Sequence, residues 1–120
     1  MATISFDFDG TLSRSDVQDF AIEMKKAGHR TMIITNRHED SDNKFVYEVA
    51  KKVGIKDHHV WFCNMIGKHR FIRPGMKIDI HLDDDWIDCE LVEQECGVPC
   101  VKMFGNPNWK EEVYKILNHK

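Results

Sequence analysis

Five consecutive residues near the start of the chain combine two acids with a sharp turn: Asp7-Phe8-Asp9-Gly10-Thr11, directly after a short apolar run. Two carboxylates at the end of a buried strand repel each other, so that one ionises more easily than the other. A divalent cation stabilises the ionised pair. One carboxylate can then act as a nucleophile while the other serves as general acid and base. This pattern indicates phosphoryl transfer.

Polar residues also follow three later apolar runs. They are Thr35 and Asn36, Cys63 and Asn64, and Asp83, Asp84 and Asp85. In a parallel sheet, ligands bind beyond the carboxyl ends of the strands, so we expect these side chains to meet Asp7 and Asp9 at one edge. Lys68 is the candidate positive charge for a phosphate, and Lys77 is its rival.

A bound phosphate requires hydrogen-bond donors, for which the Thr35 hydroxyl, the amide of Asn36 and the amides of Gly10 and Thr11 are candidates. It also requires a hard cation, and Mg²⁺ prefers carboxylate, water and phosphate oxygens. Asp7 with Asp83 or Asp84 would hold that ion, and the sequence leaves the choice between the two open. We interpret Asp88, one helical turn later, as surface charge.

The elements that must position these residues alternate between strands and helices. The expected strands are residues 4–8, 31–34, 60–63, 78–82 and 98–104. The expected helices run from a Ser15 cap to Gly28, from Ser41 or Asp42 to Gly54, over 66–72, over 86–96, and from an Asn106 cap with Pro107 at the first position. This order predicts an α/β fold, with a doubly wound parallel sheet of about five strands in three layers. We expect one domain over residues 1–120.

Helical spacing predicts which side chains face the core. Phe45 and Val46 belong to one inner face, and Ile87, Leu91 and Val92 to another. Residues 78–82 are unusual because Asp79 and His81 alternate with apolar residues, whereas a central parallel strand is normally apolar on both faces. Either these two side chains share a partly exposed face or they pair with each other.

Composition excludes several classes of protein. The chain has 120 residues and a formal net charge of -3, which gives no overall electrostatic footprint for nucleic acid. No apolar run is long enough to cross a membrane, and no signal peptide is visible. The four cysteines form no Cys-x-x-Cys motif. We therefore expect reduced thiols in a cytoplasmic protein.

The motifs, in this order, resemble the haloacid dehalogenase superfamily, in its branch of small, capless, magnesium-dependent phosphatases. The residues that carry the resemblance are 6–12, 33–37, Lys68 and 80–85. The resemblance implies a Rossmann-like fold in which Asp7 attacks phosphorus and forms an aspartyl-phosphate. It implies that Asp9 protonates the leaving oxygen and then activates water.

The resemblance assigns the remaining roles as well. Thr35 and Lys68 would hold the phosphoryl oxygens. Asp83, with Asp84 as helper or substitute, would position Mg²⁺, and the backbone carbonyl of Asp9 would be a further ligand.

Cap domains in that superfamily follow the first motif or lie between the second and third. Residues 10–15 leave room only for a short flap, and residues 35–68 for one strand–helix unit. We therefore expect an open site without a cap, which favours a bulky phosphomonoester such as a nucleic-acid end or a phosphoprotein, with a nucleotide as the smaller alternative. The basic residues between Lys68 and Lys77 would suit a nucleic-acid end.

Two rival interpretations come from other classes. A bacterial receiver domain has a similar length, acids, hydroxyl and lysine, but its phosphate-accepting Asp ends the third strand, where this chain has Cys63 and Asn64. A catalytically silent module that binds phosphate or Mg²⁺ would keep the fold without the reaction.

Overall fold

A single parallel sheet forms the centre of the molecule. The computed structural model describes residues 1–119. The strands are β1 (Thr3–Phe6), β2 (Arg30–Thr35), β3 (Val60–Phe62), β4 (Ile80–Asp83) and β5 (Cys100–Lys102). Their order in the sheet is β3-β2-β1-β4-β5, and every neighbouring pair is parallel. The predicted α/β class and the five strands are confirmed, with β2 longer than expected and the other four strands shorter.

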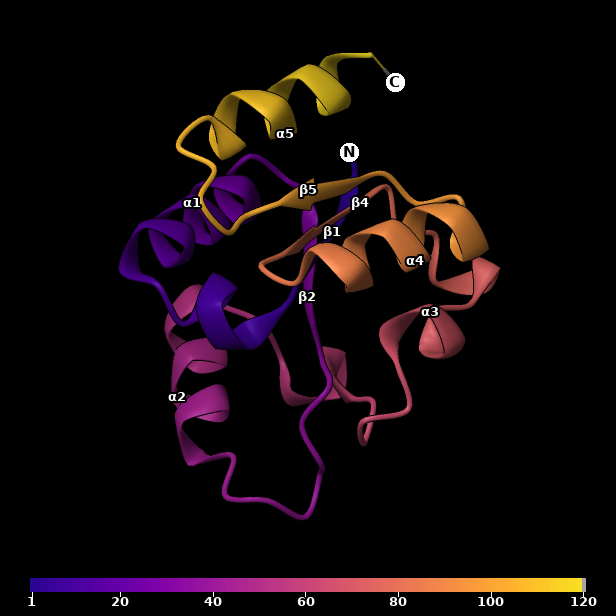
Figure 1. The fold of residues 1–120 in the computed structure, drawn as a ribbon. Coiled ribbons are helices and arrows are strands. Elements are labelled where there is room, and N and C mark those ends of the chain that lie inside the picture. Colours follow the sequence, from indigo (N-terminus) through magenta and orange to yellow (C-terminus); the bar gives the residue numbers. More distant parts are fainter. Residues whose placement is uncertain (120) are drawn as a thin grey trace.

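Helices cover both faces of this sheet, in three layers (Figure 1). They are α1 (Ser15–Lys26), α2 (Lys44–Val53), α3 (Lys68–Phe71), α4 (Trp86–Cys96) and α5 (Trp109–Asn118). Short helical turns add η1 (Phe8–Leu12), η2 (Asp57–His59) and η3 (Pro74–Met76). The elements α1, α2 and α5 pack on one face, and α3 and α4 on the other. Among the described residues, no further domain is inserted between β1 and α1 or between β2 and α3, as expected for a capless fold.

The strand order places a switch in direction between β1 and β4, because the chain winds from β1 to β3 on one side and returns to β4 on the other. Ligands of doubly wound folds bind at such a point. A receiver domain has the order 2-1-3-4-5 instead, so the topology contradicts that rival. None of the helices in residues 1–119 is both long and apolar enough to cross a bilayer.

Two predicted helix caps are wrong. Arg14, not Ser15, occupies the N-cap of α1, and Gln18 donates through Nε2 to the Ser13 carbonyl at 3.2 Å instead of closing a capping box. The last helix begins at Trp109, because Asn106 accepts from the amide of Asn108 at 3.1 Å and so forms a turn before the helix. Competition of the Asn106 side chain for a nearby amide accounts for the later start of α5.

Two predicted core residues are exposed. Phe45 is 49% exposed and only its edge packs against Phe8, with ring centroids 5.3 Å apart. Ile87 is 71% exposed, and Cys89 takes the inward position of α4 beside the correctly predicted Val92. Helix α2 also begins later than expected, at Lys44.

Both predictions for residues 78–82 fail at His81, whereas Asp79 is partly exposed, as the first of them expected. The carboxylate of Asp79, which precedes β4, accepts from the amide of Thr3 at 2.8 Å. His81 is fully buried and contacts the Ser5 hydroxyl through Nδ1 at 2.7 Å and Asp83 through Nε2 at 2.9 Å. The polar face of β4 is therefore buried and satisfied by partners on β1 and on β4 itself.

Candidate active site

The first two acidic motifs meet where β1 and β4 end. Phe6 is paired with Leu82, and the amide of Asp7 donates to the Leu82 carbonyl at 2.8 Å. Asp7 and Asp83 therefore leave adjacent strands side by side. Both carboxyl groups are buried. This pairing, set by sheet register, joins two motifs that are 76 residues apart in sequence.

Gly10 allows the chain to pass close to the second motif. Its φ of +76° lies in the region that glycine adopts without strain. A Cβ placed on it would lie 2.2 Å from Oδ2 of Asp84. A side chain at this position would therefore displace the Asp84 carboxylate, and both φ and space require glycine here.

Lys68 enters this acidic cluster from α3. Its Nζ lies 2.7 Å from Oδ1 of Asp7 and 2.5 Å from Oδ2 of Asp83, with Asp88 at 3.5 Å. The lysine is 1% exposed. Burial opposes its charge, but Asp7 and Asp83 outweigh that effect and raise the pKa of Lys68 above its ordinary value. Its rival Lys77 is exposed and lies outside this cleft.

The surroundings of Asp7 disfavour its ionised form. Burial, then the nearby charge of Asp83, raises its pKa well above the ordinary value, and Lys68 offsets only part of this. Asp83 differs: burial opposes its charge, but His81 and Lys68 prevail and lower its pKa. The two buried acids thus have opposite tendencies, whereas the sequence prediction concerned the neighbouring pair Asp7 and Asp9.

The donor set fits a hard divalent cation. Asp7, Asp83 and Asp84 each offer a carboxylate oxygen, all within 4.8 Å of one another. Asp83 already accepts from Lys68 and His81 at Oδ2 and from the Asp85 amide at Oδ1. Asp84 is the less buried of the two and adjoins Asp7. Asp7 and Asp84 are therefore the better-placed direct ligands, with Asp83 as the buried support.

A buried chain of polar groups stands behind Asp83. Ser5 bonds to His81, and His81 bonds to Asp83. Ser5 and His81 are 0% exposed and do not line the cleft, so neither reaches a substrate. These hydrogen bonds hold the orientation of Asp83 instead. The alternating pattern of residues 78–82 was the only indication of this buried network in the sequence.

The motif after β2 completes the cleft. Thr35 is buried and its hydroxyl accepts from the Arg37 amide at 3.3 Å, which leaves its own hydrogen as a donor. Asn36 donates to Asp88 at 3.0 Å, and its buried Oδ1 has no partner among the described residues. Asp88 lines the cleft and lies 3.5 Å from Lys68, so its interpretation as surface charge is wrong.

Arg37 is a site residue that the sequence reasoning did not assign. Its guanidinium makes two bonds to Asp9, at 2.7 and 2.8 Å, and lies 5.2 Å from the centre of the Phe8 ring. The pair with Arg37 lowers the pKa of Asp9. Arg37 immediately follows the Thr35-Asn36 motif, and this position in the sequence was the one indication that it belongs to the site.

Together these side chains line an open cleft of about 250 Å³. Its charged residues are Asp7, Asp9, Asp83, Asp84, Asp85, Asp88, Arg37 and Lys68. Thr35, Asn36 and Met65 complete the lining, and Thr11 contacts Asp7 through its hydroxyl at 3.4 Å. Asp85 also caps α4, because its carboxylate accepts from the amides of Ile87 and Asp88. Six carboxylates against two cations favour cation binding before any anion enters.

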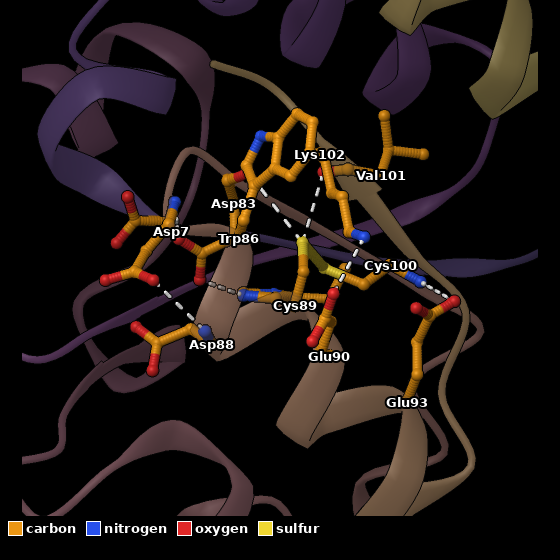
Figure 2. The surroundings of a disulfide bond; sticks show 12 residues. Asp7, Asp83, Trp86, Asp88, Cys89, Glu90, Glu93, Cys100, Val101 and Lys102 are labelled. Atoms are coloured by element: carbon orange, nitrogen blue, oxygen red, sulfur yellow. Dashed lines mark hydrogen bonds and ion pairs between the residues drawn. A yellow bond between two sulfur atoms is a disulfide. The ribbon is translucent and has the colours of Figure 1, made fainter.

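The expectation of four reduced thiols is wrong. Figure 2 shows a disulfide between Cys89 of α4 and Cys100 of β5, beside the acidic cluster. Their Cα atoms lie 5.3 Å apart because α4 packs back against β5. Cys63 and Cys96 are free, and burial raises the pKa of the Cys63 thiol to about 12. Sequence spacing alone does not define such a pairing.

Comparison with known proteins adds a remote structural likeness. No protein-family model and no curated protein matches the chain. Among solved structures, the hypothetical protein PH1952 from Pyrococcus horikoshii OT3 is similar, with 20% identity and a TM-score of 0.41. The match covers 85% of this chain and 41% of that one. We base no argument on a likeness at this level.

Proposed function

We propose that this protein is a Mg²⁺-dependent phosphomonoester hydrolase that acts through an aspartyl-phosphate on Asp7. The observation that carries the proposal is the convergence of Asp7, Asp84, Lys68 and Thr35 in one open cleft at the β1–β4 switch point. The family resemblance of the motifs supports the same reaction. Neither argument depends on the remote structural likeness.

In the proposed reaction, Asp7 is the nucleophile and Asp9 transfers the protons. A carboxylate oxygen of Asp7 attacks phosphorus as the bond to the leaving oxygen breaks, and Asp9 gives that oxygen a proton. Asp9 then takes a proton from water, whose oxygen attacks phosphorus and releases Asp7. Lys68 and Thr35 hold the phosphoryl oxygens.

A bound Mg²⁺ would neutralise the phosphoryl oxygens and the carboxylates around them. The oxygens of Asp7 and Asp84 and the backbone carbonyl of Asp9 are the proposed ligands, and Asp83 supports them from behind.

The open cleft sets the proposed substrate class. No cap covers the site in residues 1–119, so water must be excluded by the substrate itself, by a partner or by another subunit. We propose a nucleotide, a nucleic-acid end or another bulky phosphomonoester as the substrate. If a free nucleotide is hydrolysed and a phosphorylated oligonucleotide is not, the nucleic-acid end is excluded.

The first experiment measures phosphate release from an aryl phosphate with Mg²⁺ and with EDTA. We expect release only with Mg²⁺, and a loss of about a thousandfold or more in Asp7→Asn, because that variant has no nucleophile. Asp19→Asn, an exposed change on α1, is the matched control and retains activity.

An inactive wild-type protein that is folded and binds Mg²⁺ would contradict the proposal. It would favour a silent phosphate-binding module instead.

A further inference from the structure

The opposite edge of the sheet carries a basic cavity that plays no part in the proposed reaction. It has a volume of about 170 Å³. Its lining includes Lys25, His29, Arg30, Lys56, His58 and His59. These residues come from the end of α1, the start of β2 and the η2 turn. No carboxylate lines it in residues 1–119; Asp57 lies between Lys56 and His58 in sequence but outside the lining.

Helix ends explain only a part of this positive charge. Cations stabilise helix C-termini, and Lys25 does so here by donating to the carbonyl of Gly54, where α2 ends. Arg30 begins β2 and Lys56 precedes η2, so neither lies at a helix C-terminus and that argument does not apply to them. Three fixed cations and three imidazoles are thus gathered in one place without an acid among them.

The histidines are arranged as donors. Nδ1 of His29 accepts from the amide of Ala2 at 3.0 Å, which leaves its Nε2 carrying hydrogen. The rings of His58 and His59 lie 4.2 Å apart. Burial lowers the pKa of His59, and the neighbouring His58, Arg30 and Lys56 lower it further. Burial is the larger cause, and the crowded positive charge adds to it; an anion would relieve only the second effect.

We propose that this cavity is a binding site for a phosphate group, formed by Arg30, Lys56 and the histidines His29, His58 and His59. Guanidinium, ammonium and imidazole donors together match the oxygens of a tetrahedral phosphate. The site is independent of Asp7 and stands whether or not the cleft hydrolyses phosphomonoesters.

The test follows the histidine ring signals by NMR while inorganic phosphate is added in EDTA at constant ionic strength. We expect saturable shifts at His58 and His59. Arg30→Gln/Lys56→Gln weakens phosphate binding by about tenfold or more, because each lost charged hydrogen bond contributes strongly. Both substituted residues are exposed, so the fold tolerates the change. The matched control is Arg70→Gln/Lys77→Gln, also exposed and on the other side of the sheet, which binds phosphate as the wild type does.

Three results would overturn the proposal: equal shifts with sodium chloride, unchanged affinity in Arg30→Gln/Lys56→Gln, or loss of binding in the control pair instead. If the double variant does not fold, Lys56→Gln alone gives the same comparison. Glycerol phosphate, titrated in parallel, distinguishes the sources of the group. Binding of both ligands indicates an open site for monoesters, and binding of phosphate alone indicates a site for the free ion.

Discussion

The two faces of the sheet differ in what they bury. The face under α1, α2 and α5 is apolar, with Ile4, Phe6 and Leu82 at its centre. The face under α3 and α4 buries a smaller apolar cluster together with Ser5, His81, Asp83 and Lys68. Neighbouring residues of one strand point to opposite faces, so β1 and β4 contribute to both. The first face stabilises the fold through apolar packing. The second face has less apolar packing and holds a buried cluster of charged side chains instead.

The largest expected difference between the faces concerns Lys68. Lys68→Met leaves Asp7 and Asp83 buried without their ammonium partner, so we expect a loss of about 3–5 kcal/mol in the free energy of unfolding. Urea denaturation in EDTA measures it. Lys77→Met, exposed, should stay within about 0.5 kcal/mol of the wild type. An equal change in the free energy of unfolding in both variants would show that the ion pairs of Lys68 do not stabilise the fold.

Adjacent residues of β1 test the faces directly. Ser5→Ala leaves the buried Nδ1 of His81 without its partner and costs about 1–3 kcal/mol. Ile4→Val removes one methylene from the apolar face and costs about 0.5–1.5 kcal/mol. We expect only Ser5→Ala to lower phosphatase kcat/KM as well, because it loosens His81 and Asp83. Equal kcat/KM in both variants would contradict the role of the polar chain.

The exposed pair of Arg37 and Asp9 has a smaller effect on stability. Arg37→Ala should change the free energy of unfolding by less than about 1 kcal/mol, as exposed ion pairs do. Turnover should fall by about tenfold, because Asp9 loses the group that orients it. Arg14→Ala is the matched control: it breaks a similar pair with Asp16 on α1, away from the cleft. Comparable activity in the two variants would show that Arg37 has no role in the reaction.

The smallest effect concerns the thiols on the polar face. A thiol count under denaturing conditions without reductant should find two free cysteines, Cys63 and Cys96. In the native protein Cys63 should react much more slowly with iodoacetamide than Cys96, because it is 1% exposed and its pKa is raised to about 12. Four free thiols would show that the Cys89–Cys100 bond does not form in solution.

The sequence by itself determined the order of elements and the position of the first motif. Alternating apolar runs and helical spacings locate five strands, and parallel strands place their ends at one edge. Asp7, Thr35, Lys68 and Asp83 were therefore expected together before any coordinates. The local sequence was sufficient to place these residues because each motif lies directly at the end of a helix or strand.

Only the tertiary structure decided which partners these groups take. Strand register pairs Ser5 with His81, and the approach of Gly10 to Asp84 separates the exposed acid from the buried Asp83. Arg37 reaches Asp9 across 28 residues, and Cys89 meets Cys100 because α4 folds back onto β5. These contacts depend on distances between elements. The sequence pattern shows the periodicity of each helix and strand, but it does not show how far apart those elements lie in space.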